Sequence, residues 1–275
     1  MLVDSQIHLW EAHSAGRPWP SAGRQAAHRP TPPTVDETLR VLDASGIDRA
    51  VLVPPSWEGD RNDVALAAAA EHPDRFAVMG RIPLHTKTVR VLPTWRQQPG
   101  MLGLRLTLHS EPWRSGFQLD GFPWFWQEAE AAGLPVMVYA PRLLPSLALI
   151  ARRHPGLRLI IDHLALPLGR TGIDAFDEIE ELLALALLPN VAVKASALPC
   201  HSREPYPFAD LHAPLHRVFD AFGPARVFWG SDWTRLPCSY EENMRLFTDA
   251  LDFLSDDDLR SVMGDGLLNW LGWAS

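Results

Sequence analysis

Short apolar runs alternate with amphipathic stretches along the whole chain, and this alternation limits the folds that the chain can adopt. Runs with the length and residue types of β-strands lie at Leu2–His8, Arg49–Pro54, Phe76–Ile82, Met101–Leu108, Pro135–Ala140, Leu157–Asp162, Val191–Ala195 and Arg226–Gly230. Stretches with helical character lie between them at Val35–Ser45, Asp63–Glu71, Phe122–Ala132, Pro145–His154, Phe176–Leu188 and Ala213–Phe222. Because strands that alternate with helices pair in parallel, the pattern predicts a parallel sheet covered by helices.

The length of the chain then favours one architecture. Eight strand–helix units within 275 residues match a (β/α)8 TIM barrel of the α/β class. No linker or low-complexity tract interrupts the sequence, so we expect residues 1–275 to form a single domain. A doubly wound open sheet competes with the barrel, but it needs a glycine-rich turn after the first strand, and His8–Glu11 contains no glycine. In a barrel, the proline-rich segment Arg17–Pro33 becomes a loop that covers the mouth.

Charge and composition exclude several kinds of partner. The formal net charge of −8 provides no basic patch that would neutralise phosphates, so we expect no nucleic-acid partner. No apolar run is long enough to cross a bilayer, and the N-terminus lacks the pattern of a signal peptide, so we expect no membrane partner and a cytoplasmic location. The 2 cysteines, Cys200 and Cys238, fit a reducing compartment. Tryptophans in the loops suit either a pocket or a subunit contact, so a homo-oligomer remains open.

The active site of a TIM barrel forms at the C-terminal ends of its strands. Polar and ionisable residues stand at or just beyond these ends: Gln6, His8, Ser56, Arg81, Arg105, His109, Tyr139, Arg142, Asp162, His163, Lys194, His201, Arg203, Asp232 and Trp233. Because all the strand ends meet at one rim, imidazoles, carboxylates, a phenol and several cations converge there. We therefore expect a polar pocket for a small-molecule partner.

The first strand contributes two polar side chains to this rim. Gln6 and His8 are two residues apart, so they point to the same face of the strand. A catalytic zinc usually has three protein ligands and one open position, and His8, His163 and Asp232 could supply the three. Glutamine is a poor zinc ligand but a good hydrogen-bond donor. These residues therefore favour no cofactor and leave one zinc ion, or another divalent metal, as the alternative.

Five motifs in chain order resemble those of a known family. They are Asp4–Trp10 (DSQIHLW), Gly103–Leu106 (GLRL), Ile161–Pro167 (IDHLALP), Val193–Ser196 (VKAS) and Phe228–Trp233 (FWGSDW). Together they resemble the amidohydrolase superfamily, and within it the branch of small lactonases that includes 2-pyrone-4,6-dicarboxylate lactonase and sugar lactonases. The resemblance covers nearly the full chain and implies an amidohydrolase-like barrel.

The resemblance also implies roles for particular residues. The family usually has His-x-His in strand one, and the strand-six histidine and the strand-eight aspartate complete its polar centre; here these are His163 and Asp232. This chain departs from the pattern at Gln6, which replaces the first histidine, and at Tyr139, which stands near the strand-five ligand of metal-dependent members. Because the pyrone dicarboxylate lactonase has a strand-five tyrosine and works without a divalent metal, the resemblance extends metal-free operation to this chain.

The expected activity is hydrolysis of a small carboxylated or sugar-derived lactone. Asp232 would take a proton from water, while His8, His163 and Gln6 would hold the developing oxyanion. Arg105 would pair with a substrate carboxylate, since a guanidinium matches carboxylate geometry. Further candidates for substrate binding are Tyr139, Ser56, Arg81, Arg142, Lys194 and Trp233.

Structural roles and other functions compete with this hypothesis. His8 could be a hydrogen-bonded core residue, Asp232 a helix cap and Lys194 half of a buried ion pair. Asp162 favours a structural role, and His28 resembles an ordinary surface or loop residue. A zinc-dependent decarboxylase, a lactone isomerase, or a catalytically decayed small-molecule binding protein could use the same barrel.

Overall fold

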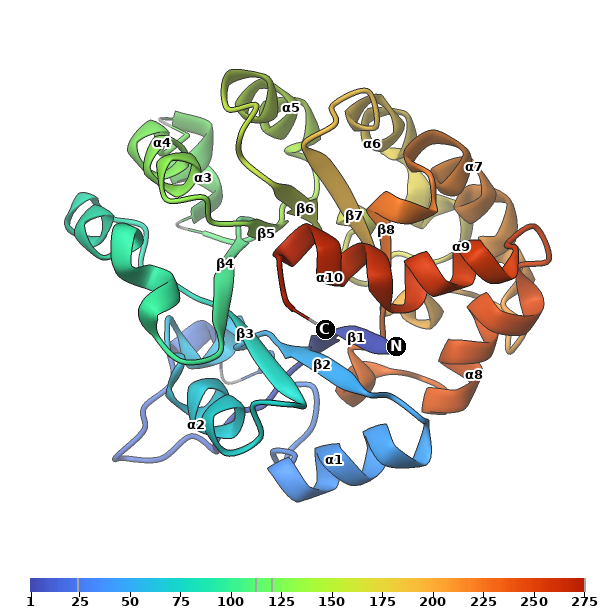
Figure 1. Ribbon diagram of the computed structural model, residues 1–275, viewed down its shortest axis with the longest axis horizontal. Helices are drawn as coiled ribbons and strands as arrows, with labels where there is room; N and C mark the ends of the chain where they lie inside the picture. The colour runs from blue at the N-terminus through green and yellow to red at the C-terminus, as the bar shows by residue number, and fades with distance from the viewer. Residues whose placement is uncertain (24, 112, 120, 275) are drawn as a thin grey trace.

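The computed structural model describes residues 1–23, 25–111, 113–119 and 121–274. Its centre is an 8-stranded parallel sheet in which the strands follow one another in sequence order, as Figure 1 shows. The strands are β1 (Val3–Ile7), β2 (Arg49–Leu52), β3 (Phe76–Gly80), β4 (Met101–Thr107), β5 (Val136–Tyr139), β6 (Leu159–Ile161), β7 (Val191–Ser196) and β8 (Val227–Gly230). All the predicted strands are therefore confirmed, and the fold is the predicted (β/α)8 TIM barrel.

The sheet curls so that β8 returns to β1. The backbone N–H of Asp232, just beyond β8, donates to the carbonyl of Gln6 at 2.9 Å. The last residue of β8 must be small at this seam, because a Cβ on Gly230 would lie 2.4 Å from Ser5 Oγ. The absence of a side chain on Gly230 thus allows the two strands to approach closely enough to close the barrel.

Helices surround the barrel in the order that the sequence pattern predicts. They are α1 (Val35–Ala44), α2 (Asp63–Glu71), α3 (Trp113–Leu119), α4 (Pro123–Ala131), α5 (Leu144–Arg153), α6 (Ile179–Leu185), α7 (His212–Phe222), α8 (Tyr240–Arg245), α9 (Asp256–Arg260) and α10 (Gly266–Leu271). After β3 the chain forms 3-10 turns over Thr86–Gln97 instead, and Pro93 within them disfavours a continuous α-helix. None of the helices that the structure describes has the length and apolar character needed to cross a membrane.

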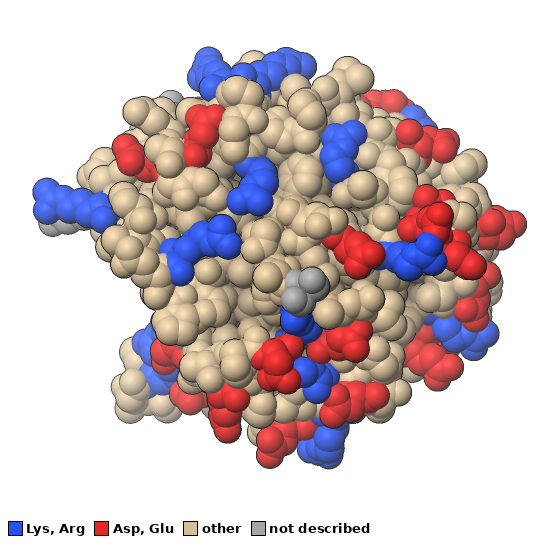
Figure 2. Space-filling model, in the orientation of Figure 1, with Lys and Arg blue, Asp and Glu red and all other residues tan. Residues whose placement is uncertain are grey.

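Two apolar layers hold the barrel together. Buried residues on the outer faces of the strands, such as Leu52 and Val138, pack against the helices. Inside the barrel a second cluster includes Val51 and Ile160, and Leu267 and Leu271 of α10 complete it. Helix α10 therefore closes the end of the barrel that faces the viewer in Figure 1, which leaves the opposite end for the pocket. On the face shown in Figure 2, most acidic side chains lie toward the right and the lower edge, with basic ones among them, and residues of other types cover the rest.

The loop between β1 and α1 covers the mouth, as the proline-rich segment predicted. Arg17 fixes this loop through ion pairs with Glu58 at 2.8 Å and Asp63 at 2.6 Å. Trp10, Trp19 and Trp57 form a separate apolar cluster beneath it. These contacts bring the far part of the loop over the C-terminal ends of the strands.

Candidate active site

A pocket of about 90 Å³ opens among the C-terminal ends of the strands and the covering loop. Its described lining residues are His8, Ala26, His28, Ser56, Trp57, Arg105, Thr107, His109, Tyr139, His163, Leu168, Asp232 and Arg235. A wider hollow of about 460 Å³, also lined by Arg81, shares Ser56, Trp57 and His109 with it. The two hollows form one cleft, and the part with the most ionisable groups is the candidate active site.

Left-handed backbone conformations place two side chains of this pocket. Asp232 has φ 51° and His163 has φ 53°, and each is the second residue after the end of its strand, β8 or β6. A residue other than glycine rarely adopts this conformation, and each instance costs about 1–3 kcal/mol. Strain of this kind is often kept at functional sites, so the backbone conformation agrees with a role for these two residues in the pocket.

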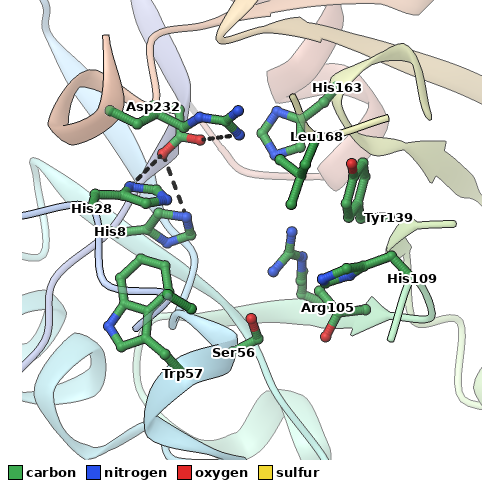
Figure 3. Close-up of a pocket in the computed structure, with 13 residues that line it drawn as sticks. His8, His28, Ser56, Trp57, Arg105, His109, Tyr139, His163, Leu168 and Asp232 are labelled. Carbon is green, nitrogen blue, oxygen red and sulfur yellow. Dashed lines mark ion pairs between the residues drawn. The ribbon is translucent and has the colours of Figure 1, made fainter. Parts of the chain in front are cut away.

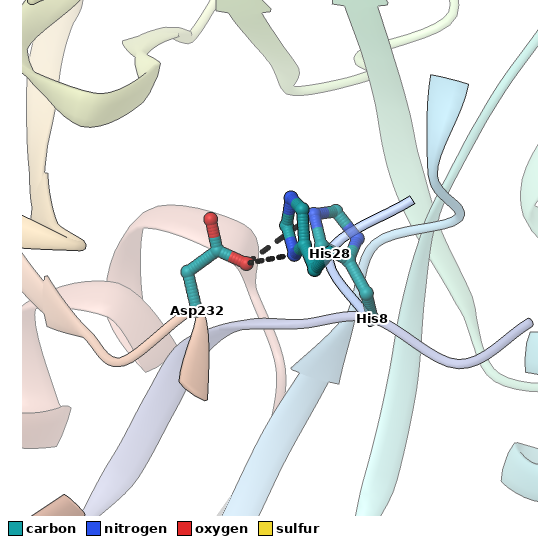
Figure 4. Close-up of side chains that lie close together, drawn as sticks. All are labelled: His8, His28 and Asp232. Atoms are coloured by element: carbon teal, nitrogen blue, oxygen red, sulfur yellow. Dashed lines mark ion pairs between the residues drawn. The ribbon is translucent and has the colours of Figure 1, made fainter. Parts of the chain in front are cut away.

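Asp232 lies on one wall of the pocket with two imidazoles, as Figures 3 and 4 show. Its Oδ1 is 3.5 Å from His8 Nε2 and 3.7 Å from His28 Nδ1, and its Oδ2 is 3.6 Å from Arg235 Nη1. The side chain is 1% exposed, yet neither carboxylate oxygen has a hydrogen-bond partner among the described residues. A buried carboxylate without donors is costly, which indicates that a ligand, water or ion completes this site.

The charge state of Asp232 follows from its neighbours. Burial alone would raise its pKa, but interactions with the imidazoles of His28 and His8 and with the guanidinium of Arg235 outweigh burial and lower the pKa below the ordinary value. Asp232 is therefore a carboxylate at neutral pH. A carboxylate of this kind can accept a proton from a water molecule in the pocket.

His8 is neutral, and its hydrogen bonds define which nitrogen carries the proton. Nδ1 lies 2.5 Å from the carbonyl oxygen of Val53, which can only accept, so Nδ1 donates. Nε2 then presents its lone pair, and Gln6 Nε2 donates to it at 3.2 Å. Burial is the main reason that the pKa of His8 falls to about 3.

Gln6 points to the same side as His8, as the spacing predicted, but it lies beneath the pocket. Its side chain is fully buried, it is not among the described lining residues, and its amide contacts His8 and Lys194. The expectation that Gln6 holds the oxyanion directly therefore does not fit this geometry. His8 does not fit that role either, because its Nε2 carries no proton to donate.

His163 lies across the pocket from Asp232 in Figure 3. Its Nδ1 is hydrogen-bonded to Ser196 Oγ at 2.8 Å, and burial lowers its pKa well below the ordinary value. The backbone carbonyl of Ser196, which can only accept, lies farther from Nδ1, at 3.4 Å. With the nearer Ser196 hydroxyl as donor to Nδ1, the proton of the neutral ring lies on Nε2. His163 can then donate a hydrogen bond into the pocket.

Arg105 and Lys194 share one buried carboxylate. Arg105 Nε contacts Asp162 Oδ2 at 3.0 Å, and Lys194 Nζ contacts Asp162 Oδ1 at 2.9 Å. Lys194 and Asp162 therefore form a buried ion pair, which is the structural alternative that the sequence analysis gave for Lys194. Lys194 is not among the described lining residues, whereas Arg105 lines the pocket. The two cations and one carboxylate leave one positive charge, and it faces the pocket through Arg105.

Only some of the other candidates for substrate binding line the pocket. Ser56 and Tyr139 line the pocket, and the Tyr139 hydroxyl donates to the carbonyl of Leu166 at 2.8 Å. Arg81 lines only the wider hollow, where it pairs with Asp60. Two candidates lie outside the described lining of both hollows: Arg142, which is exposed and pairs with Asp177, and Trp233, whose ring packs under Arg29.

Two ionisable residues of the pocket, His28 and Arg235, were not anticipated from the sequence. His28 was expected to be an ordinary loop residue, but its loop folds back so that the ring packs against Trp57 and faces Asp232. Arg235, three residues after Asp232, turns back toward the carboxylate. Neither lies in a periodic segment, so strand and helix patterns gave no signal for them.

The set of possible metal ligands differs from the predicted one, because His28 takes the place of His163. One nitrogen each of His8 and His28 and one oxygen of Asp232 lie within 4.8 Å of one another, and this is the group of such donors found among the described residues. His163, which was expected to be the third ligand, does not belong to it. The correction follows from the covering loop, which brings His28 closer to Asp232 than strand six brings His163.

Comparison with known proteins identifies the family. The family model described as amidohydrolase matches residues 3–265. The chain belongs to the amidohydrolase family. The five motifs that resembled this family predicted it correctly.

Several amidohydrolase relatives are known by activity or structure. The chain is 28% identical over 243 residues to the L-fucono-1,5-lactonase of Burkholderia ambifaria, covering 84% of this chain and 79% of that enzyme. It is also 28% identical over 249 residues to the 4-sulfomuconolactone hydrolase of Hydrogenophaga intermedia, covering 86% of this chain and 78% of that enzyme. The crystal structure of an amidohydrolase from Burkholderia multivorans with bound zinc has the same fold, with a TM-score of 0.83, 24% identity and 99% of each chain covered.

Proposed function

We propose that the protein hydrolyses a small lactone with water activated by Asp232. The observation that carries the proposal is the carboxylate of Asp232 at the mouth of the barrel, which is buried and ionised and has no hydrogen-bond donor in the part of the chain that the structure describes. The L-fucono-1,5-lactonase and the 4-sulfomuconolactone hydrolase described above are named for lactone substrates, each of which contains a cyclic ester. These findings together support a lactonase-type hydrolase.

In the proposed reaction, water adds across the ring ester. Asp232 takes one proton from a water molecule while the water oxygen attacks the lactone carbonyl carbon. His163 Nε2 donates a hydrogen bond to the oxyanion that develops. The ring C–O bond then breaks, Asp232 returns its proton to the departing ring oxygen, and the product is the open-chain hydroxy acid.

We propose that Arg105 recognises a carboxylate on the substrate. Its Nε is engaged by Asp162, and no hydrogen bond to its terminal nitrogens is present among the described residues. The buried group of Arg105, Lys194 and Asp162 carries one uncompensated positive charge, which an anionic substituent would neutralise. A lactone that bears a carboxylate is therefore the favoured substrate.

The zinc-dependent form of this hydrolysis is the second candidate. The donors of His8, His28 and Asp232 fit a catalytic zinc by their chemical type, and the unpartnered oxygens of Asp232 favour a cation. These three residues would hold the ion, which would supply polarisation of the lactone carbonyl or of bound water. Against it, His8 Nε2 already accepts a hydrogen bond from Gln6.

A hydrolysis screen tests the proposed function. Sugar lactones, muconolactones and pyrone carboxylates would be assayed with a pH indicator, with and without a strong chelator. We expect wild type to hydrolyse at least one lactone and Asp232→Asn to lose turnover at least 1,000-fold (on the order of the loss of a catalytic group). Asp177→Asn is the matched surface control. Turnover retained by a folded Asp232→Asn variant would refute the role of Asp232.

We further propose that residues 1–275 act as one domain and that the protein works in the cytoplasm. The motifs of the site come from both ends of the chain, His8 near the start and Asp232 near the end. Both cysteines, Cys200 and Cys238, are free thiols, which fits a reducing compartment. Separation of cell fractions followed by immunodetection tests the location.

A further inference from the structure

Lys194 is a fully buried cation and is not among the described residues that line the pocket. It contacts Gln6, which in turn contacts the lining residue His8. Its Nζ donates to Asp162 Oδ1 at 2.9 Å and to the side-chain oxygen of Gln6. An ammonium group has donors and no acceptor. The contact therefore fixes the orientation of the Gln6 amide, with its oxygen toward Lys194 and its NH₂ group toward His8.

The other end of this chain of hydrogen bonds is fixed in the same way. The carbonyl oxygen of Val53 can only accept, so His8 Nδ1 must carry a proton. The neutral ring then has a lone pair at Nε2, and the Gln6 NH₂ group donates to it at 3.2 Å. In the series Lys194, Gln6, His8 and Val53, each hydrogen bond thus has only one possible donor.

We propose that Lys194 and Gln6 form a lock that keeps His8 Nε2 occupied and so disfavours metal binding at the candidate site. A metal ion would need this lone pair, because Nδ1 of His8 faces the backbone. To bind it, Gln6 would have to break its contact with His8 while Lys194 still holds the amide oxygen. Lys194 acts through Gln6 and is a positioning residue.

The remaining candidate ligands already have protein neighbours as well. His28 Nδ1 is hydrogen-bonded to Thr234 Oγ1 at 2.9 Å, and Arg235 Nη1 lies 3.6 Å from Asp232 Oδ2. Arg235 supplies positive charge where a dication would bind. The lock therefore acts on a site in which His28 already has a hydrogen-bond partner and Asp232 already has a neighbouring cation. Removing the lock alone would strengthen metal binding without creating an ideal site.

This inference rests on the proposed function only in treating the pocket around Asp232 as the active site, because its test measures zinc. Chelator-treated wild type, Gln6→Ala, Gln6→His and Lys194→Met would be titrated with zinc against a fluorescent chelator. Gln127→Ala, on the exposed side of α4, is the matched control. We expect Gln6→Ala to bind zinc about tenfold more tightly than wild type, because zinc no longer has to displace the hydrogen bond that Gln6 donates to His8 Nε2, and one ordinary hydrogen bond corresponds to a factor of this size. Gln6→His adds a ligand and should bind more tightly still.

Equal zinc affinity in wild type and Gln6→Ala, with one zinc bound to each, would overturn the proposal. Lys194→Met should also bind zinc more tightly than wild type, and weaker binding by a folded Lys194→Met variant would count against the lock. If Lys194→Met does not fold, Gln6→Ala decides the question, since it leaves the pair of Lys194 and Asp162 in place.

A second readout does not involve metal at all. The ¹⁵N chemical shifts of the His8 ring distinguish a proton on Nδ1 from one on Nε2, and we expect the Nδ1–H form in wild type. A proton on Nε2 would overturn the proposal. If no lactone is hydrolysed while the zinc and NMR results agree with expectation, the proposed function fails and the lock stands.

Discussion

At the scale of single residues, Arg105 is a pocket cation whose charge is only partly balanced by its carboxylate partner. It shares Asp162 with Lys194, so two cations face one carboxylate. Its side chain is 5% exposed, so water does little to screen the excess charge. A buried guanidinium in this position is suited to an anionic substrate.

Replacing Arg105 with methionine should separate charged substrates from neutral ones. We expect Arg105→Met to raise KM for a carboxylated lactone about 10- to 100-fold, the range for loss of a hydrogen-bonded charge, and to change KM for a neutral lactone far less. Steady-state kinetics with a matched pair of lactones measure this difference. Arg142→Met, at an exposed ion pair, is the control. Equal losses for both lactones would show that Arg105 has a structural role.

At the scale of elements, the seam between β1 and β8 depends on one buried carboxylate. Asp4 in β1 accepts hydrogen bonds from the backbone of Gln6 at 2.9 Å, the backbone of Ser231 at 2.9 Å and the hydroxyl of Tyr240 at 2.7 Å. The hydroxyl of Ser231 also donates to it. Asp4 therefore joins the first strand to the segment that positions Asp232.

Removing this carboxylate should weaken the whole barrel. We expect Asp4→Ala to lower the free energy of unfolding by about 3 kcal/mol or more, because several buried donors lose their acceptor. Urea unfolding followed by circular dichroism measures the change. Asp256→Ala, on the exposed surface of α9, should stay within about 0.5 kcal/mol of wild type. An Asp4→Ala variant as stable as wild type would show that β1 and β8 are held mainly by backbone contacts and packing.

At the scale of the whole molecule, the neutral imidazoles at the mouth couple stability to pH. Burial lowers the pKa of His8 to about 3 and, together with Arg105 and Arg81, lowers that of His109 to about 4. In the unfolded chain, each imidazole binds a proton near pH 6.5. Below that pH the unfolded chain binds more protons than the folded one, so stability is fully present above pH 6.5 and falls as the pH falls toward 4.

This linkage predicts a large loss of stability in mild acid. His8 alone should cost about 2 kcal/mol between pH 7 and pH 5, since one pKa unit corresponds to about 1.4 kcal/mol. Urea unfolding at the two pH values measures the loss. His109→Gln should show a smaller loss than wild type, because one of the linked groups is gone. Equal stability of wild type at pH 7 and pH 5 would contradict the neutral buried state of these rings.

Much of the architecture and part of the site follow from local sequence. The eight strands, most of the helices and the positions of His8, Arg105, His163 and Asp232 at strand ends could be predicted. Their periodicity is set by short-range geometry, and the ends of parallel strands meet at one rim. The covering loop has no such periodicity, so the position of His28 could not be predicted.

The sequence by itself determined the barrel, its family and the set of groups at its mouth. Only the tertiary structure decided how those groups pair. Gln6 and Lys194 are 188 residues apart, and their contact turns the Gln6 amide toward His8 and away from the pocket. The physical reason is that repeating patterns record which face of an element is buried, whereas the direction of a hydrogen bond and the balance of buried charge depend on partners that folding brings together.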